Sequence, residues 1–146
     1  MDRVSKEQRS EIMRAVKREG TSAEMRVRKM AHRLGLRFRL HRQDLPGTPD
    51  LVFPKYGTCI FVHGCFWHRH AGCRRATIPK SNKAYWTKKF LENVARDKRV
   101  KRSLKSRGWK VVTIWECRAM DDSKLEKALR SSFTDLNNNG TKVRLI

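Results

Sequence analysis

Residues 60–73 read Ile-Phe-Val-His-Gly-Cys-Phe-Trp-His-Arg-His-Ala-Gly-Cys, an apolar run that leads directly into a loop of metal-binding and aromatic residues. The segment holds three of the five histidines and two of the four cysteines in the chain. Cys65, His70 and Cys73 have the side chains and the close spacing of a zinc site. His63 and His68 remain as candidate acid/base groups. We therefore expect the rest of the chain to fold around this segment.

Two bulky aromatic residues, Phe66 and Trp67, lie among these polar side chains. Burial inside a polar loop removes little of their surface from water, so it gives little stabilisation. Aromatic and apolar side chains can instead enter DNA as wedges between base steps. The loop thus predicts a metal site, a proton donor or acceptor, and a DNA wedge.

Composition points to nucleic acid as the partner. The 146 residues fit one domain. Lysine and arginine number 35 against 14 acidic residues, which gives a formal net charge of +21 and a pI near 10.8. No apolar run approaches the roughly 20 residues of a membrane span. The N-terminus lacks the apolar core of a signal peptide, so we expect a reducing cytoplasm, where zinc thiolates are favoured over disulfides.

Residues 1–20 predict a basic N-terminal arm. Six basic residues occur there, with Ile12, Met13 and Val16 as the apolar anchors. Two interpretations remain open, because runs of charge are usually solvated surfaces. The arm is either a surface helix or a segment that embraces DNA through residues such as Arg14 and Lys17.

A capping-box pattern, Thr21-Ser-Ala-Glu24, opens a predicted helix at residues 22–34, which Gly35 ends. Glu24 has a structural interpretation, in which its side chain reaches back to the helix cap, and a catalytic one. The apolar residues of this helix recur at helical spacing: Ala23, Val27, Met30, Ala31 and Leu34.

An acidic residue and a histidine, Asp50 and His63, are predicted to lie at the ends of two strands. Residues 36–40 predict a short strand, and the Pro- and Gly-rich turn at 44–50 delivers Asp50 to the start of another apolar strand. Residues 58–62 predict a strand that runs into His63, so we expect Asp50 and His63 at neighbouring strand ends. This arrangement resembles the core of restriction-endonuclease-like nucleases. Their second element, Asp/Glu-x-Lys, is absent, and Phe61-Val62-His63 stands in its place.

A long helix is predicted at residues 81–104, and Asp97 falls within its apolar stripe. A carboxylate on a buried stripe needs a partner. Asp97 either forms a structural salt bridge or faces His63 and His68. Six of the ten residues at 98–107 are basic and suit phosphate contacts. The stripe itself comprises Trp86, Phe90, Val94, Val100 and Leu104.

The C-terminal part predicts a strand at 109–117, a helix at 122–133, and a turn or loose tail from 137. Cys117, at the end of the strand, is the candidate fourth zinc ligand. Cys59, within a strand, is expected to be a buried small apolar residue. We expect one folded domain at 21–136, between the arm at 1–20 and the tail at 137–146.

Five motifs occur in an order that resembles the very short patch repair (Vsr) DNA mismatch endonucleases. They are Leu45-Pro-Gly-Thr-Pro-Asp50, Val62-His-Gly-Cys-Phe-Trp-His68, Asn93-Val-Ala-Arg-Asp97, Gly108-Trp109 and Trp115-Glu-Cys117. The resemblance covers residues 9–129. It implies an α/β, restriction-endonuclease-like fold with a central mixed sheet flanked by helices. It also implies nicking of one strand of double-stranded DNA, 5′ to the thymine of a T·G mismatch left by deamination of 5-methylcytosine.

The resemblance also implies roles for the candidate site residues. Asp50 would bind the catalytic Mg²⁺, with the backbone carbonyl of Val62 near the metal. Three residues, His63, His68 and Asp97, would activate the attacking water or protonate the leaving oxygen. Glu24 matches a functionally important acid of the family.

The remaining implied sites concern zinc and DNA. A structural Zn²⁺ would be held by Cys65, His70, Cys73 and Cys117, although two residues separate His70 from Cys73 where one is usual. Phe66, Trp67 and Trp86 would be wedges; for Trp86 a place in the apolar core is the alternative. We expect further DNA contacts from Lys88 and Lys89. A monomer, a cognate cytosine-5 methyltransferase and mismatch-repair proteins are implied by the resemblance alone.

Two other functions remain open at this point. Net charge, aromatic residues and zinc ligands fit a zinc-stabilised DNA-binding protein without catalysis equally well. A nuclease of the same fold that acts on another DNA substrate is the second. The acids and histidines expected at the strand ends favour an enzyme, because a protein that only binds DNA has no need of them.

Overall fold

A computed structural model of the chain describes residues 21–134. The predicted arm, with Arg14 and Lys17, and the predicted tail at 137–146 lie outside the described residues. Within residues 21–134 no helix combines the length and apolarity that crossing a membrane would require.

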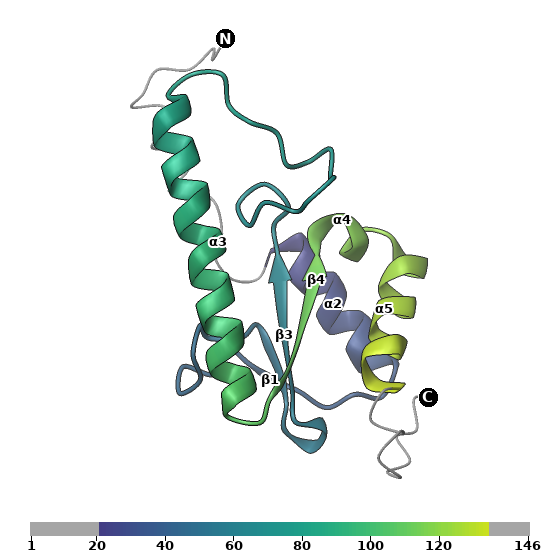
Figure 1. Cartoon of the computed structure of the whole chain (residues 1–146). Helices are drawn as coiled ribbons and strands as arrows, with labels where there is room; N and C mark the ends of the chain where they lie inside the picture. The colour runs from purple at the N-terminus through teal and green to yellow at the C-terminus, as the bar shows by residue number, and fades with distance from the viewer. Residues whose placement is uncertain (1–20, 135–146) are drawn as a thin grey trace.

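A four-stranded sheet in the order β1-β2-β3-β4 lies at the centre of the part of the chain that the structure describes (Figure 1). β1 (Arg39–Leu40), β2 (Leu51–Phe53) and β3 (Thr58–His63) pair antiparallel, whereas β3 and β4 (Lys110–Trp115) are parallel. The parallel pair is connected through the long helix α3 (Lys83–Ser106), as a crossover between parallel strands requires. The expected mixed α/β sheet is therefore confirmed.

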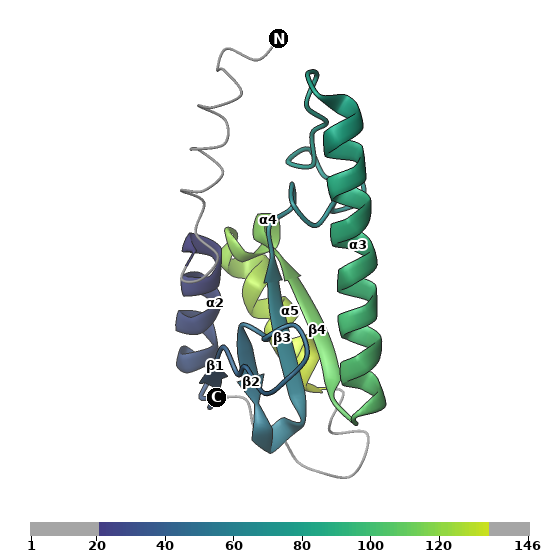
Figure 2. The same ribbon diagram turned by 90° about the vertical axis from the view of Figure 1, so that its left-hand side faces the viewer.

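Helices cover both faces of the sheet (Figure 2). On one face lie α2 (Ser22–Arg33), the short α4 (Glu116–Ala119) and α5 (Asp122–Thr134). α3 lies on the other face. Successive side chains of a strand point to opposite faces of the sheet. Leu51 and Phe53 therefore pack in the core under α2 and α5, whereas Val52 packs in the core under α3. This alternation explains why β2 is apolar throughout.

The turn before Asp50 packs closely against α3. Gly47 has a φ of +72°, and a Cβ at this position would collide with the side chain of Val100. Only glycine satisfies both the left-handed backbone and the close approach. The turn that precedes Asp50 is thereby fixed against the helix.

Several predicted boundaries differ from the structure. The strand predicted at 36–40 is confined to Arg39–Leu40, because Leu36 is buried in the core beside the end of α2. The predicted helix at 81–104 runs instead from Lys83 to Ser106. The strand predicted at 109–117 ends at Trp115, and Cys117 lies in α4 rather than on the strand. Glu116 and Cys117 leave the direction of the strand because α4 begins at Glu116, directly after Trp115.

Candidate active site

One edge of the sheet collects the chemically active residues. β3 and β4 both end there because they are parallel, and β2 begins there because it is antiparallel to β3. A cleft of about 1110 Å³ opens at this edge. Its polar lining includes His41, Asp50, His63, His68 and Asp97, together with the basic residues Arg69, Arg96, Lys98 and Lys101. Asp50 and His63 therefore share one cleft, although they belong to separate side-chain clusters.

Asp50 lies in the first cluster, with Glu24 and His41. The backbone N–H of Val62 donates to Asp50 Oδ2 over 2.7 Å. Burial raises the pKa of Asp50 to about 7, the N–H of Val62 opposes the shift, and the neighbouring Glu24 carboxylate adds to it. Metal ligands must be deprotonated, so a cation here would compete with a proton.

Glu24 is 2% exposed and points at the cleft residues rather than at its helix cap. The side chain of Thr21 does accept the N–H of Glu24, over 3.1 Å, so half of the expected capping box is present. The other half is wrong: the Glu24 carboxylate instead accepts from Arg28 and lies 3.2 Å from His41 Nε2. A buried carboxylate requires such charged partners, and these decide its direction.

The second cluster consists of His63, His68 and Asp97. His68 Nδ1 lies 2.7 Å from Asp97 Oδ2. The rings of His63 and His68 stack with their centroids 3.8 Å apart and their planes 6° apart. Burial, aided by the neighbouring His68, lowers the pKa of His63 to about 4. His63 is therefore neutral at pH 7 and only weakly basic, and its free ring nitrogen can accept a hydrogen bond.

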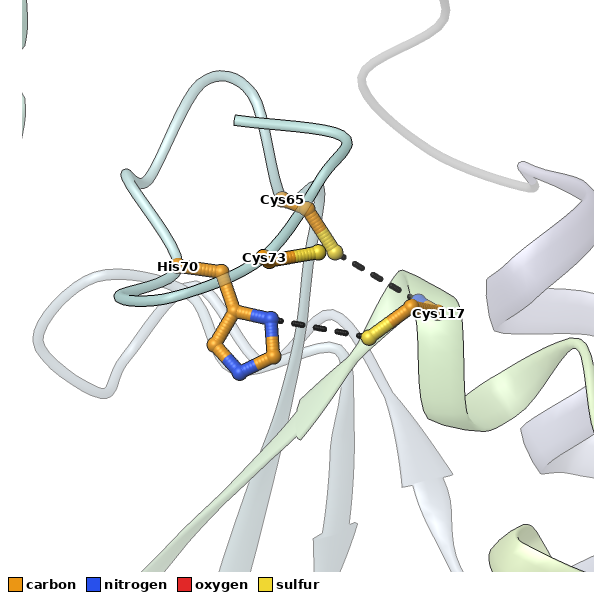
Figure 3. Close-up of side chains that lie close together, drawn as sticks. All are labelled: Cys65, His70, Cys73 and Cys117. Atoms are coloured by element: carbon orange, nitrogen blue, oxygen red, sulfur yellow. Dashed lines mark hydrogen bonds between the residues drawn. The ribbon is translucent and has the colours of Figure 1, made fainter. Parts of the chain in front are cut away.

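A third cluster has the donor set of a structural zinc site. Ligand atoms of Cys65, His70, Cys73 and Cys117 all lie within 4.8 Å of one another. The four side chains converge from the loop after β3 and from α4 (Figure 3). Cys117 Sγ lies 3.5 Å from His70 Nδ1, and the N–H of Cys117 donates to Cys65 Sγ over 3.4 Å. Ala71 and Gly72 separate His70 from Cys73. Gly72 has a φ of +71°, so the chain turns there and both ligands remain in the cluster.

The thiols of this cluster differ in their local environments. Burial raises the pKa of Cys65 to about 12. A backbone N–H, that of Arg75, lowers the pKa of Cys73. A thiolate set of this kind forms when a metal displaces the thiol protons.

Trp115, at the end of β4, connects the zinc-type cluster with the histidine pair. Its ring stacks on His70 with centroids 4.3 Å apart and planes 11° apart. Its edge contacts His63, with a centroid distance of 5.5 Å. Trp115 had no predicted role of its own, because only the register of β4 against β3 brings it beside His63.

Two of the three candidate wedge residues pack together against α3. Phe66 and Trp67 are half-buried and meet edge to face, with centroids 5.3 Å apart. Phe66 also contacts Phe90, and Trp67 contacts Trp86. Trp86 is only 3% exposed, so it occupies the core position that was its alternative interpretation. Phe66 and Trp67 are the two that reach the surface of this loop.

Two residues with no predicted role of their own, Asn93 and Arg69, hold this loop in place. Asn93 is 6% exposed, and its Nδ2 donates to the backbone carbonyl of Trp67 over 3.2 Å. Arg69 donates to the carbonyls of Phe66, Ala76 and Thr77, and its guanidinium lies 4.0 Å from the Phe90 ring centroid. The sequence did offer one signal for Asn93, because it is a polar residue on the apolar stripe of the long helix, where a side chain needs a hydrogen-bond partner.

Basic residues surround the cleft and continue along α3. Lys88 and Lys89 are exposed on its N-terminal half. The basic residues that follow Asp97 are also exposed: Lys98, Arg99, Lys101, Arg102, Lys105 and Arg107. Such a row of exposed cations beside a cleft suits the phosphates of a nucleic acid.

Comparison with known proteins identifies the family of this chain and several relatives. Residues 1–75 match the family model described as DNA mismatch endonuclease Vsr. The chain is 48% identical over 130 residues to the type II nicking enzyme V.XorIIP of Xanthomonas oryzae pv. oryzae. The matched segment covers 89% of this chain and 95% of the relative. It is 39% identical over 117 residues to DNA mismatch endonuclease Vsr of Escherichia coli, covering 80% and 74%. The type II nicking enzyme V.HpaIIP of Haemophilus parainfluenzae is 40% identical over 116 residues, covering 79% and 82%.

The chain is therefore a DNA endonuclease, and the cleft with its acids and histidines is the candidate for its active site. The chain belongs to the Vsr family of DNA mismatch endonucleases. Its substrate is DNA, and the interpretation as a DNA-binding protein without catalysis is set aside.

Proposed function

We propose that this endonuclease nicks one strand of duplex DNA on the 5′ side of the thymine of a T·G mismatch, by Mg²⁺-dependent hydrolysis within a restriction-endonuclease-like fold. One observation carries the proposal: Asp50 and the His63, His68 and Asp97 cluster line a single cleft bordered by basic residues and by residues 68–71 of the loop after β3. The cleft thus combines a cation ligand, proton-transfer groups and phosphate contacts.

The residues around Asp50 fit a Mg²⁺ ion. Carboxylate oxygens are the ligands that Mg²⁺ prefers, and the ligand atoms of Asp50 and Glu24 lie within 4.8 Å of each other. Two neighbouring carboxylates repel each other unless a cation or a proton intervenes. When bound, Mg²⁺ would neutralise negative charge on the scissile phosphate. We assign Asp50 as its ligand, together with the Val62 carbonyl.

His63, His68 and Asp97 are assigned to proton transfer. Asp97, 2.7 Å from His68 Nδ1, orients that ring and stabilises its protonated form. His63 is neutral at pH 7 and stacks on His68, so the pair presents two imidazole rings to the cleft for water positioning and proton transfer. These histidines take the place of the lysine that related nuclease cores use.

The Cys65, His70, Cys73 and Cys117 cluster is assigned to a structural Zn²⁺. Three thiols and one imidazole make a closed four-ligand set, which leaves no position for a substrate. The set ties the loop after β3 to the start of α4. Through the stacking of Trp115 on His70 and its edge contact with His63, it also helps to fix the proton-transfer residues.

Mismatch selection is assigned to Phe66 and Trp67. Unstacking a base step costs a few kcal/mol, and it costs least where a wobble pair already stacks poorly. Both side chains belong to a loop that begins immediately after His63, so a wedge placed there enters the duplex beside the cleft. Lys88, Lys89 and the basic residues of α3 would contact phosphates and set the orientation of the duplex.

The remaining assignments rest on the family resemblance. The enzyme would act as a monomer in the cytoplasm on sites made by a cognate cytosine-5 methyltransferase, in concert with mismatch-repair proteins. The predicted arm at residues 1–20, including Arg14 and Lys17, would embrace the duplex.

A panel of duplexes that differ in one base pair tests the substrate. T·G, A·C, T·C and T·T mismatches and a T·A pair are placed in the same flanking sequence, and the panel is repeated in several methyltransferase-site contexts. We expect nicking of the T·G duplex in at least one context and of the T·A duplex in none. Equal nicking of all the mismatches, or of T·A, would contradict the proposed specificity.

A further inference from the structure

His41 lies in the same cluster as Asp50 and Glu24, and nothing in the family resemblance gave it a role. Its Nε2 is 3.3 and 3.2 Å from the two carboxylate oxygens of Glu24 and 4.0 Å from Asp50 Oδ1. The ligand atoms of all three residues lie within 4.8 Å of one another. Ligands about 2.1 Å from one ion lie roughly 3 to 4.2 Å apart. The distances from His41 to Glu24 and to Asp50 fall in this range, so the three side chains lie close to the spacing that one cation requires.

The backbone holds His41 in this position. β1 pairs with β2 through Leu40 and Leu51, and the N–H of His41 donates to the carbonyl of Asp50 over 3.3 Å. His41 has a φ of 45°, a left-handed conformation that residues with a Cβ seldom adopt. The pairing of β1 with β2 thus places His41 and Asp50 on neighbouring segments of the backbone, at the edge of the sheet where the cleft opens.

The nature of the three groups favours a cation over a simple ion pair. Glu24 and Asp50 bring two carboxylates into a poorly solvated place, and only Glu24 is contacted by Arg28. His41 Nε2, which faces both carboxylates, can bind a metal through its lone pair when neutral. Two oxygens and one imidazole nitrogen form a mixed donor set, which divalent transition ions accept more readily than Mg²⁺ does.

We propose that His41 is a direct ligand of the catalytic cation, bound through Nε2 together with the carboxylates of Asp50 and Glu24. The proposal rests on the proposed function, because it extends the cation site assigned to Asp50. It also predicts a metal preference: the site binds Mn²⁺ more tightly than an oxygen-only site would. The alternative is that His41 only positions Glu24 by a hydrogen bond.

Mn²⁺ binding to the zinc-loaded full-length protein, without DNA, separates the two roles. Electron spin-echo measurements on bound Mn²⁺ detect the nitrogen nucleus of a directly coordinated imidazole, and titration followed by electron paramagnetic resonance gives the affinity. The variants are His41→Gln, which keeps a hydrogen-bonding side chain, and Asp50→Asn. His32→Gln is the matched control, because His32 is exposed on α2 and outside all three clusters.

We expect nitrogen coupling in the wild type and in His32→Gln and its loss in His41→Gln, because only a directly bound imidazole gives this coupling. The affinity for Mn²⁺ should also fall in His41→Gln and stay at the wild-type value in His32→Gln. Bound Mn²⁺ without nitrogen coupling, coupling that survives in His41→Gln, or no Mn²⁺ binding by the wild type would each overturn the proposal. Failure of the proposed function gives a different pattern, in which Asp50→Asn binds Mn²⁺ as well as the wild type does.

Discussion

His68 and Asp97 come from segments 29 residues apart, yet His68 Nδ1 lies 2.7 Å from Asp97 Oδ2. The contact joins the loop after β3 to the middle of α3. The carboxylate therefore orients the His68 ring, on which the His63 ring stacks. The catalytic assignment of this cluster can therefore be tested at Asp97 without touching either histidine.

Asp97→Asn is expected to lower the single-turnover nicking rate by about 10²- to 10⁴-fold, because an amide cannot stabilise a protonated His68. The affinity for mismatched DNA should change little. Asp122→Asn, at an exposed carboxylate paired with Arg26, is the matched control and should nick normally. A nicking rate for Asp97→Asn within a few-fold of the wild type would show that Asp97 has only a structural role.

Cys117→Ser should lower the zinc content and the thermal stability together, because it removes one ligand of a four-ligand set. Metal analysis of the purified protein and a thermal unfolding scan measure the two effects. Cys59→Ala is the control, since Cys59 is fully buried but lies outside the Cys/His cluster. It should lose some stability while keeping its zinc. Full zinc content in Cys117→Ser would exclude Cys117 as a ligand.

The thiol of Cys59 is expected to be inert in the folded protein. Burial raises its pKa from 9.0 to about 11, so almost no thiolate is present at pH 8. Iodoacetamide followed by peptide mass spectrometry should leave Cys59 unmodified until the protein is unfolded. Rapid labelling of Cys59 under native conditions would contradict its burial.

The same pKa shift gives a stability change with a defined sign. Between pH 9 and pH 11 the unfolded thiol loses its proton while the folded thiol keeps it, so the stabilisation is complete below pH 9 and is lost as pH rises. The loss amounts to about 3 kcal/mol once it is complete above pH 11, and to about half of that at pH 10. Urea unfolding of the wild type and Cys59→Ala at pH 8 and pH 10 should show the steeper decline in the wild type.

Replacing Trp67 by alanine should reduce the preference for T·G over T·A duplexes by about 10-fold or more, because the wedge no longer offsets the cost of unstacking. Binding to T·A duplexes, which depends on phosphate contacts, should change less. Tyr85→Ala, at a 60% exposed aromatic residue of α3, is the control. Competition binding with the two duplexes measures the ratio, and an unchanged ratio for Trp67→Ala would remove the wedge assignment.

Much of the fold could be predicted from local sequence patterns. The period of apolar residues in α2 and α5 and the apolar runs of β2 and β3 identify these elements directly. The end of β4 could not be predicted, because Glu116 and Cys117 continue an acceptable strand pattern and only the tertiary structure turns them into α4. The length of β1 likewise depends on the burial of Leu36 in the core.

The candidate site was predictable where its residues occur in motifs. His63, His68 and the zinc-type ligands lie within one short segment, whereas His41 stands alone between Leu40 and Arg42 with no spacing pattern. Its approach to Glu24 and Asp50 follows from the pairing of β1 with β2, which is a property of the assembled sheet. The direction of the Glu24 side chain, for which a capping and a catalytic interpretation were both open, could not be decided from the sequence for the same reason, since its partner His41 lies outside the helix-cap motif.

Strand nicking of end-labelled duplexes with and without metal tests the central claim most directly. Two duplexes differ only in one T·G or T·A pair, each is incubated with Mg²⁺ or with EDTA, and Asp50→Asn is run beside the wild type. We predict a single nick 5′ of the mismatched thymine, by the wild type with Mg²⁺ only, while Asp50→Asn binds the T·G duplex without cutting it. Nicking in EDTA, or unchanged turnover by Asp50→Asn, would contradict a cation-dependent active site built on Asp50.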